Sequence, residues 1–137
     1  MKSYIHTVQY YETDRMGITH HSNYVRWMEE ARVDYLRQTG WGLEKLEEMG
    51  VVSPVVGLDC RFRQTTTFAD EISITVRITK FTGPRFKLAY TMKNAAGKVV
   101  CEAESDHCFT DASGRIVRLD KRFPEFAKVL ESLVCQE

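Results

Sequence analysis

The chain has 137 residues, of which 43% are hydrophobic and 28% are charged. This length and balance fit a single folded domain and argue against a disordered chain. The 19 basic and 19 acidic residues cancel, so net charge indicates neither a nucleic-acid nor a membrane-surface partner. No apolar run approaches the roughly 20 residues of a membrane span, and the first residues lack a signal-peptide core. We therefore expect one cytoplasmic domain over residues 1–137.

The N-terminal third predicts one strand followed by two helices. "SYIHTVQYY" alternates and is rich in β-branched and aromatic residues, which predicts a strand ending near Tyr11. Residues Ser22–Gln38 then follow the period of an amphipathic helix, which Ser22 or Asn23 could cap and Gly40 would end. Its apolar face comprises Tyr24, Trp27, Met28, Ala31 and Tyr35. "GLEKLEEMG" predicts a short second helix.

Beyond Val51 the hydrophobic period changes from 3.6 to 2. Four segments alternate: "VVGLDCRFRQTT", "DEISITVRITK", "RFKLAYTMK" and "KVVCEAESDHCFTD". The turn-like connections between them predict an antiparallel sheet with one covered face. The tail "RFPEFAKVLESLVCQE" predicts a closing helix, with Pro124 in its first turn. The order of elements favours an α+β fold with the sheet wrapped around the long helix, and its edge strands invite a second subunit.

The four cysteines are scattered and form no C-x-x-C pair: Cys60, Cys101, Cys108 and Cys135. This spacing, in a chain expected in the cytoplasm, predicts reduced and partly buried thiols. Neither a disulfide framework nor a zinc site is indicated.

The stretch "ETDRMGITHHSNY", residues 12–24, concentrates ionisable side chains directly before the predicted helix. Asp14 could be a turn or capping residue, or it could face a cleft as a catalytic carboxylate. His20 and His21 could bind a metal with Asp14, but adjacent histidine side chains normally point apart. Glu12 is expected to be a solvated or salt-bridged surface carboxylate.

The longer run "YYETDRMGITHHSNYVRWMEEAR" resembles the opening of hotdog-fold acyl-CoA thioesterases of the 4-hydroxybenzoyl-CoA thioesterase family. That family has an aromatic strand, a T-D-x-x-G turn, and N-Y or S-Y at the start of a helix. The matching residues here are Tyr10, Thr13, Asp14, Gly17, His21, Asn23, Tyr24, Glu29 and Arg32. The order of strands and the stretch "TTTFADEISI" extend the resemblance over most of the chain.

The resemblance implies a hotdog fold, a homodimer with two active sites at its interface, and frequent pairing of dimers into tetramers. It also implies hydrolysis of an acyl-CoA thioester to a free acid and coenzyme A, with no metal and no cofactor. On this interpretation Asp14 is the nucleophile, forming an anhydride, or the base that activates water. The backbone N–H of His21 would contact the thioester oxygen, and Gly17 would allow close approach of the backbone.

Other candidate residues surround this centre. Tyr24 belongs to the core face but could line the acyl pocket, and Glu29 could reach the site or pair with Arg32 on the same helix. The facing subunit is expected to contribute threonine hydroxyls that bind substrate or water, from Thr65, Thr66 and Thr67. The phosphates of coenzyme A would meet the cations of one turn, Lys80, Arg85 and Lys87.

Three alternatives stay open at this point. The protein could hydrolyse acyl groups carried on acyl carrier protein, or it could bind an acyl group without turning it over. A hotdog dehydratase fits less well, because the D-x-x-G turn followed by a helix matches the thioesterase arrangement. Thr19 and His20 stand where the family often has hydrophobic or aromatic residues, so aromatic, short and medium acyl chains all remain possible.

Overall fold

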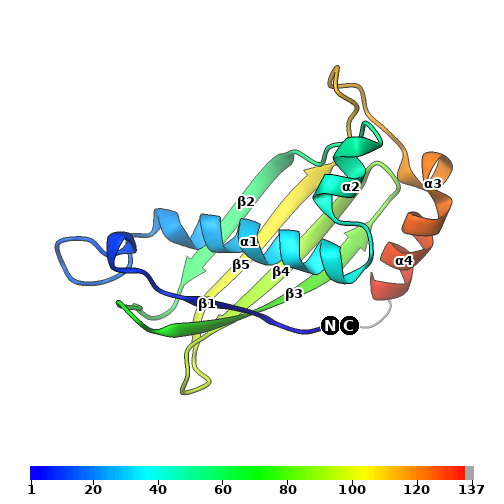
Figure 1. Cartoon of the computed structure of the whole chain (residues 1–137). Helices are drawn as coiled ribbons and strands as arrows, with labels where there is room; N and C mark the ends of the chain where they lie inside the picture. The colour runs from blue at the N-terminus through cyan, green and yellow to red at the C-terminus, as the bar shows by residue number, and fades with distance from the viewer. Residues whose placement is uncertain (135–137) are drawn as a thin grey trace. The chain divides into compact units, whose positions relative to one another are not determined.

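The computed structural model describes residues 1–134, so the thiol predicted at Cys135 lies outside the described residues. Figure 1 shows the elements in chain order: β1 (Tyr4–Thr7), a 3-10 helix η1 (Tyr10–Glu12), α1 (Ser22–Gln38), α2 (Leu43–Glu48), β2 (Val55–Phe62), β3 (Glu71–Phe81), β4 (Arg85–Lys93), β5 (Val99–Cys108), α3 (Leu119–Arg122) and α4 (Pro124–Val134). Both predicted N-terminal helices and all four alternating strands are confirmed.

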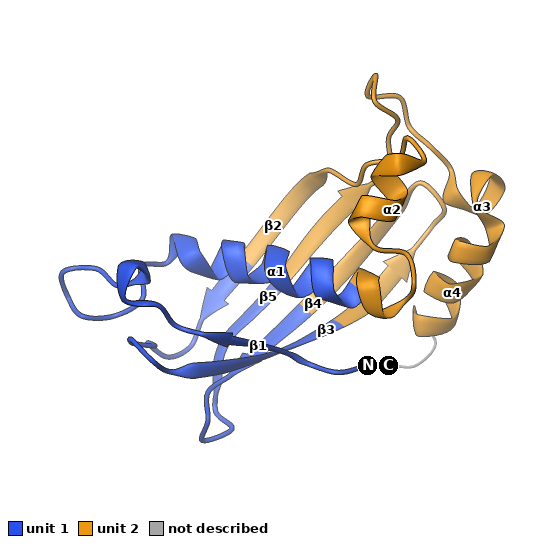
Figure 2. Ribbon diagram, viewed as in Figure 1, with its two compact units in different colours: residues 1–35, 60–76, 90–103 blue, residues 36–59, 77–89, 104–137 orange. Residues whose placement is uncertain are grey.

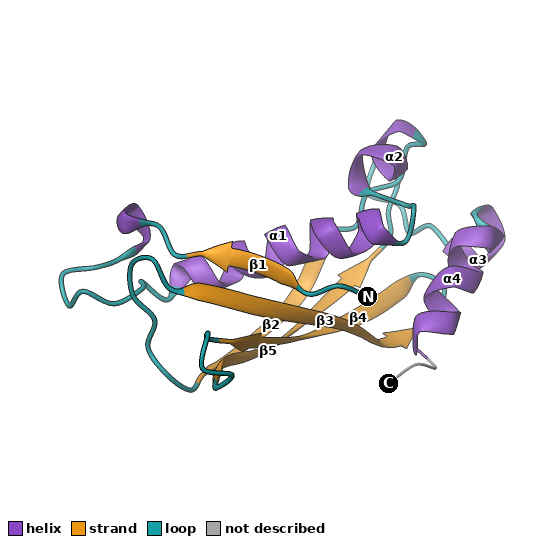
Figure 3. Cartoon of the chain, turned by 60° about the horizontal axis from the view of Figure 1, so that its bottom comes forward, coloured by secondary structure: helices purple, strands orange, loops and turns teal. Residues whose placement is uncertain are grey.

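The five strands form one sheet in the order β1-β3-β4-β5-β2. The short strand β1 pairs antiparallel with β3, with Tyr4 opposite Ile74, and Figure 3 shows the two strands side by side. Strands β1 and β2 are therefore the two edges of the sheet. The predicted α+β class is confirmed.

The chain divides into two compact units, shown in Figure 2. Unit 1 contains residues 1–35, 60–76 and 90–103, and unit 2 contains residues 36–59, 77–89 and 104 onward. Helix α1 and the strands β2 to β5 each have residues in both units. All of the ionisable stretch from Glu12 to Tyr24 belongs to unit 1.

In unit 1, the apolar face of helix α1 forms the core together with the strands. Every residue predicted for this face is buried: Tyr24, Trp27, Met28, Ala31 and Tyr35. The strand residues Ile72, Ile74 and Met92 of the same unit are also fully buried, and complete burial of such a side chain contributes about 1.5–3 kcal/mol. The Cys60 thiol donates to Met28 Sδ at 3.5 Å.

Three cysteines are reduced thiols that form no disulfide among residues 1–134, as predicted: Cys60, Cys101 and Cys108. A hydrogen bond with Cys60 and burial both raise the pKa of Cys101, so this thiol stays protonated. Protonated thiols are poor nucleophiles.

Strand β1 is shorter than predicted, because the chain turns through η1 before it reaches Asp14. This turn reverses the expectation for Glu12, which is only 4% exposed and lies inside unit 1. Its carboxylate accepts hydrogen bonds from Gln9 N–H (2.8 Å) and Trp27 Nε1–H (2.9 Å) and pairs with His6 Nε2 (2.8 Å). Burial opposes ionisation of Glu12, but the three hydrogen bonds together outweigh it and lower the pKa of this carboxyl.

Neither predicted residue caps helix α1. Ser22 Oγ pairs with His20 Nδ1 at 2.8 Å, and the Asn23 amide donates to the carbonyls of Glu12 and His20 at 3.0 and 3.2 Å. Asn23 is buried, so it ties the preceding loop to the helix instead of capping its N–H groups. Gly40 does follow the helix with a φ of +86°, as expected of a helix stop.

In unit 2, aromatic side chains provide much of the core. Trp41 stacks on Phe126 with ring centroids 5.0 Å apart, and Phe86 stacks on Phe109 at 4.9 Å. The predicted closing helix is confirmed over the described residues as α4, which Pro124 begins. A short helix that the sequence did not predict, α3, precedes it, and the backbone breaks between them at Phe123. Among residues 1–134, none of the helices has the length and apolar character needed to cross a membrane.

Candidate active site

Asp14 lies in a tight turn of unit 1 between η1 and α1. Its backbone N–H donates to the Ile18 carbonyl (2.9 Å), and its own carbonyl accepts from Gly17 N–H (3.0 Å). Oδ1 of the carboxylate accepts the N–H of Met16 at 2.8 Å. Asp14 therefore does stabilise a turn, which was one of the two roles expected for it. It uses one carboxylate oxygen, and the side chain is half-buried at the surface of a cavity.

The backbone directly before helix α1 presents an N–H group that has no acceptor among residues 1–134. Its neighbours are all engaged: His20 N–H on Glu12 O (2.8 Å), Ser22 N–H on His20 Nδ1 (3.2 Å), Asn23 N–H on His20 O (3.0 Å) and Tyr24 N–H on His21 O (3.2 Å). Within residues 1–134, the N–H of His21 has no such partner. A free donor at a helix N-terminus is suited to an oxyanion or a polarised carbonyl.

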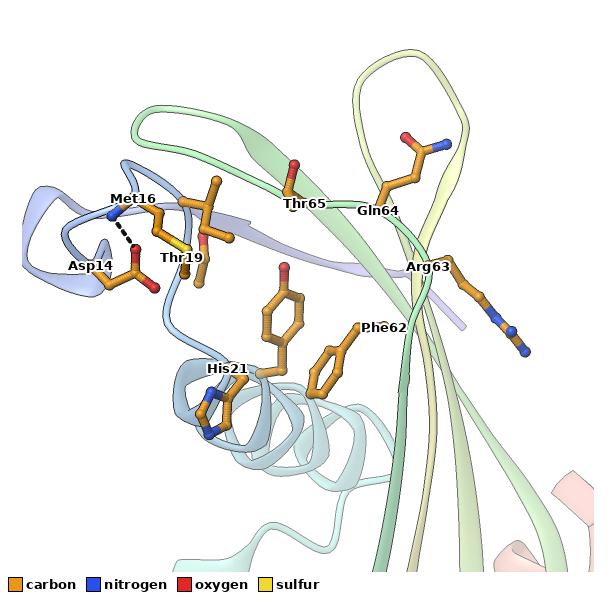
Figure 4. Close-up of a pocket in the computed structure, with 10 residues that line it drawn as sticks. Asp14, Met16, Thr19, His21, Phe62, Arg63, Gln64 and Thr65 are labelled. Atoms are coloured by element: carbon orange, nitrogen blue, oxygen red, sulfur yellow. Dashed lines mark hydrogen bonds between the residues drawn. The ribbon is translucent and has the colours of Figure 1, made fainter.

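A cavity of about 300 Å³ brings these two groups to one place in unit 1. The residues that line it are Asp14, Met16, Ile18, Thr19, His21, Tyr24, Phe62, Arg63, Gln64 and Thr65. Figure 4 shows Phe62 facing the cavity, whereas the Arg63 side chain points away from it. Arg63 pairs instead with Glu102 at 2.9 Å.

Aromatic rings form one side of the cavity. Tyr24 and Phe62 meet edge to face with centroids 5.1 Å apart, and His21 lies 6.5 Å from Phe62. The rings of His20 and His21 stack at 4.2 Å, so they do not point apart as expected. Within residues 1–134, no group of three or more His, Cys, Asp or Glu side chains is arranged to hold a metal ion.

The three predicted threonines occupy three different environments. Thr65 lines the cavity of its own chain. Thr66 is 2% exposed, and its hydroxyl lies 2.6 Å from the Thr19 hydroxyl and 3.0 Å from that of Tyr24. The Thr67 hydroxyl donates a hydrogen bond to the Gly17 carbonyl at 2.7 Å, and this bond joins the Asp14 turn to the threonine segment that follows β2.

Other predicted site residues lie outside the cavity lining. Glu29 is exposed on α1, while Arg32 is buried, and burial lowers the pKa of Arg32. The three cations predicted to bind coenzyme A all belong to unit 2, where Lys87 pairs with Glu104 at 3.1 Å: Lys80, Arg85 and Lys87.

Sequence reasoning did not identify five of the cavity residues: Met16, Ile18, Phe62, Arg63 and Gln64. Phe62, Arg63 and Gln64 directly precede the predicted residue Thr65 in sequence. The alternation of strand β2 could have placed Phe62 on the covered side, but only the folded chain brings this strand end opposite Asp14.

Comparison with known proteins identifies the fold and the superfamily of this chain. The crystal structure of a DHNA-CoA thioesterase from Staphylococcus aureus superposes with a TM-score of 0.94, at 24% identity, over 98% of this chain and 91% of that one. The predicted hotdog fold is thereby confirmed. The sequence profile of the Thioesterase-like superfamily matches residues 8–133. This chain belongs to that superfamily.

Relatives of similar length support the same class. "Putative acyl-CoA thioesterase YneP" of Bacillus subtilis is 30% identical over 125 residues, which cover 90% of this chain and 91% of YneP. The 1,4-dihydroxy-2-naphthoyl-CoA hydrolase of Thermosynechococcus vestitus is 29% identical over 108 residues, covering 78% and 74% of the two chains. The predicted enzyme class, a thioester hydrolase, is confirmed. Membership in the narrower 4-hydroxybenzoyl-CoA thioesterase family stays a prediction.

Proposed function

We propose that this protein hydrolyses acyl-CoA thioesters at the unit 1 cavity, with Asp14 as the catalytic carboxylate. The observation that carries the proposal is the presence, in one cavity lining, of the Asp14 carboxylate and of His21, whose N–H has no acceptor in residues 1–134. A thioester carbonyl between them would have a base or nucleophile on one side and an oxyanion donor on the other.

Two routes use this arrangement. In the first, Asp14 takes a proton from water while the water oxygen attacks the carbonyl carbon. The oxyanion accepts the His21 N–H, the C–S bond breaks, and the coenzyme A thiolate takes the proton from Asp14. In the second, Asp14 attacks directly and expels the thiolate, and water then hydrolyses the mixed anhydride. Both routes yield the free acid and coenzyme A.

The cavity favours an aromatic acyl group. Its rings and apolar side chains would contact such a group on one side, through Tyr24, Phe62 and Ile18. By their names, the Thermosynechococcus vestitus relative acts on 1,4-dihydroxy-2-naphthoyl-CoA and the Staphylococcus aureus protein acts on DHNA-CoA. For the phosphates of coenzyme A, the cations of Lys80, Arg85 and Lys87 remain the proposed contacts.

We also propose that the active form is a homodimer, with pairing of dimers into a tetramer. Strand β2 supports this assembly because it is an edge of the sheet. It exposes half or nearly half of four apolar side chains: Val55, Val56, Leu58 and Phe62. Exposed apolar edge strands are common sites of subunit pairing. Because the strands β2 to β5 run through both units, we further propose that residues 1–137 act as a single hotdog domain.

The test is release of coenzyme A thiol from a panel of aromatic and aliphatic acyl-CoAs, with wild type beside Asp14→Asn. Asparagine can still accept the Met16 N–H, so the turn is retained while the base is lost. We expect kcat to fall by about 100-fold or more. Asp106→Asn is the matched control, because Asp106 is exposed on β5 and lies outside the cavity lining.

The outcomes separate the alternatives. If wild type and Asp14→Asn hydrolyse the panel equally, Asp14 has no catalytic role. If neither hydrolyses it while acyl-CoA still binds, the protein is an acyl-binding module. Activity only on acyl groups carried by acyl carrier protein would change the assigned carrier and leave the site chemistry in place.

A further inference from the structure

The side chain of His6 is buried between two carboxylates of unit 1. Its Nε2 lies 2.8 Å from Oε1 of Glu12, and its Nδ1 lies 3.0 Å from Oε1 of Glu30. His6 belongs to β1, Glu12 to η1 and Glu30 to α1. One imidazole ring therefore joins three elements of unit 1, and the hydrolysis proposed above makes no use of it.

The two carboxylates determine where the hydrogens of His6 lie. An ionised carboxylate offers lone pairs and no hydrogen, so a ring nitrogen that bonds to it must donate. Although burial opposes ionisation of Glu12, the hydrogen bonds that it accepts lower its pKa, so it is ionised at neutral pH. Oε1 of Glu30 already accepts the Tyr4 hydroxyl at 2.7 Å and acts as an acceptor as well. Both ring nitrogens of His6 are therefore donors, and an imidazole with two N–H groups is a cation.

The other neighbours of the His6 ring are uncharged. The ring packs on the indole of Trp27 with centroids 4.7 Å apart, and an aromatic face attracts a cation. Burial and the hydrogen bond to the nearby carboxylate raise the pKa of Tyr4 to about 12, so its phenol is neutral. On β3 the residue opposite His6 is Ile72. These contacts leave the two carboxylates as the charged partners of the ring.

Glu12 connects His6 to both groups of the proposed site. Its carbonyl accepts the N–H of His20 at 2.8 Å, which ties the segment carrying the His21 N–H to Glu12. Asp14 follows Glu12 by two residues. The distance between the Asp14 carboxylate and the His21 N–H therefore depends on where Glu12 is held.

His6 provides the connection between Glu12 and the sheet. It is paired with β3 through the register of β1, so its backbone has a fixed position in unit 1. A charge-assisted hydrogen bond to a buried carboxylate is among the stronger polar contacts in a protein. Removing its donor would leave Glu12 buried with one partner fewer, and the carboxylate would move to find another.

We propose that His6 is a positioning residue for thioester hydrolysis, which, held as a cation between Glu12 and Glu30, fixes the Asp14 carboxylate relative to the His21 N–H. This inference rests on the proposed function, because it concerns the same two groups. A misplacement of about 1 Å between reacting groups can cost on the order of 100-fold in rate. His6 is not among the residues that line the cavity, so substrate binding should change little.

The experiment compares His6→Gln with His6→Asn. The amide nitrogen of glutamine is spaced from the backbone like Nε2 and can still donate to Glu12, whereas that of asparagine is spaced like Nδ1 and reaches only Glu30. Both changes remove the ring and its charge, so they share any general loss. With the best acyl-CoA of the panel, we expect kcat to fall by about threefold or less in His6→Gln and by about tenfold or more in His6→Asn. KM should stay within about twofold of wild type in both.

Thr7→Asn is the matched control, because it places the same amide at the next position of β1, where the side chain is exposed. Its kcat should equal that of wild type. Thermal unfolding would establish that all three variants are folded at the assay temperature. Full activity in His6→Asn would overturn the inference. Equal losses in His6→Asn and His6→Gln would also overturn it, since the effect would then come from loss of the ring and not of the hydrogen bond to Glu12.

Nuclear magnetic resonance tests the same inference without turnover. Long-range proton–nitrogen spectra of wild type at pH 7 should show both ring nitrogens of His6 protonated, with the signals assigned by their loss in His6→Gln. The backbone amide signals of residues 13–23 should move in His6→Asn and stay close to wild type in His6→Gln.

These spectra distinguish a failure of the inference from a failure of the proposed function. A neutral His6 ring, or equal displacement of the loop signals in the two variants, would contradict the positioning role even in an active thioesterase. If the spectra agree with expectation and wild type releases no coenzyme A, the contact between His6 and the loop is confirmed and the proposed activity is wrong.

Discussion

The indole N–H of Trp27 donates a 2.9 Å hydrogen bond to Oε2 of Glu12. Trp27 is fully buried in the middle of the apolar face of α1, and Glu12 is two residues before Asp14. The helix core and the turn that carries Asp14 are therefore joined through a buried carboxylate. Its negative charge is stabilised by donors from three different segments, namely Gln9, His6 and Trp27.

This buried carboxylate predicts a specific pH dependence of stability. The pKa of Glu12 is lowered in the folded protein, so its contribution is fully present above its unfolded pKa of about 4.5. The contribution is lost as the pH falls through the lower, folded value. Glu12→Gln should destabilise the protein at pH 7 by about 1–3 kcal/mol, because buried donors lose a charged acceptor.

Urea unfolding from pH 7 to pH 3 measures this effect. The free-energy difference between wild type and Glu12→Gln should shrink on the acid side of pH 4.5. Glu48→Gln, an exposed change on α2, serves as control and should follow wild type throughout. A difference that stays constant over the whole range would show that Glu12 does not contribute through its charge.

Substitutions at His21 can separate its backbone from its ring. His21→Ala keeps the N–H, so kcat should fall by less than about tenfold if the backbone carries the oxyanion role. His21→Pro removes the N–H and should lower kcat by about 100-fold or more. Circular dichroism and thermal unfolding would establish that the proline variant keeps helix α1. A large loss in His21→Ala would instead assign the role to the imidazole.

Phe62 is predicted to contribute to recognition of the acyl group and little to folding. It is 51% exposed, yet it contacts Tyr24 at the cavity wall. Phe62→Ala should raise KM for aromatic acyl-CoAs by about 3–10-fold, the size expected for one lost aromatic contact. Stability should change by less than about 1 kcal/mol. Steady-state kinetics with benzoyl-CoA and hexanoyl-CoA would check this, since an equal rise in KM for both would argue against a ring-specific contact.

The proposed dimer predicts that a charge on strand β2 breaks the assembly. Leu58 is 50% exposed on this edge, and Leu58→Asp should convert a dimer to a monomer and lower activity with it. Light scattering coupled to size exclusion measures the mass. Ile116→Asp is the control, because it places the same charge on another exposed apolar residue, in the connection between β5 and α3. The prediction fails if Leu58→Asp keeps the mass of wild type.

Local pattern was enough to predict most of the helices and strands of this fold, although it missed η1 and α3. Helix α1 has the predicted bounds because the period of Tyr24, Trp27, Met28 and Ala31 leaves one way to bury them. The alternation in β3 and β4 likewise has one inward parity. These hydrophobic periods involve residues that are close in sequence, so one sequence is sufficient to detect them.

Interactions between distant segments were not predictable in the same way. Glu12 was expected at the surface because the strand was extrapolated through Tyr11, whereas η1 turns the carboxylate inward to His6 and Trp27. Phe62 and Thr66 meet Tyr24 only through packing across unit 1. No spacing rule links residues about forty positions apart, so the contacts of Tyr24 with Phe62 and Thr66 could not be predicted from the sequence.

The turn that presents Asp14 also depends on a left-handed backbone conformation at Gly17. Gly17 has a φ of +78°, and a Cβ added there would meet no atom within 4 Å. Space is therefore available for a side chain, and the restriction comes from chirality, since an L-residue in this region is disfavoured by about 1–2 kcal/mol. A D-alanine would satisfy the turn where L-alanine strains it. Among the other encoded residues, asparagine and aspartate tolerate this conformation best. Few substitutions at position 17 are therefore compatible with the turn, although the space around it is open.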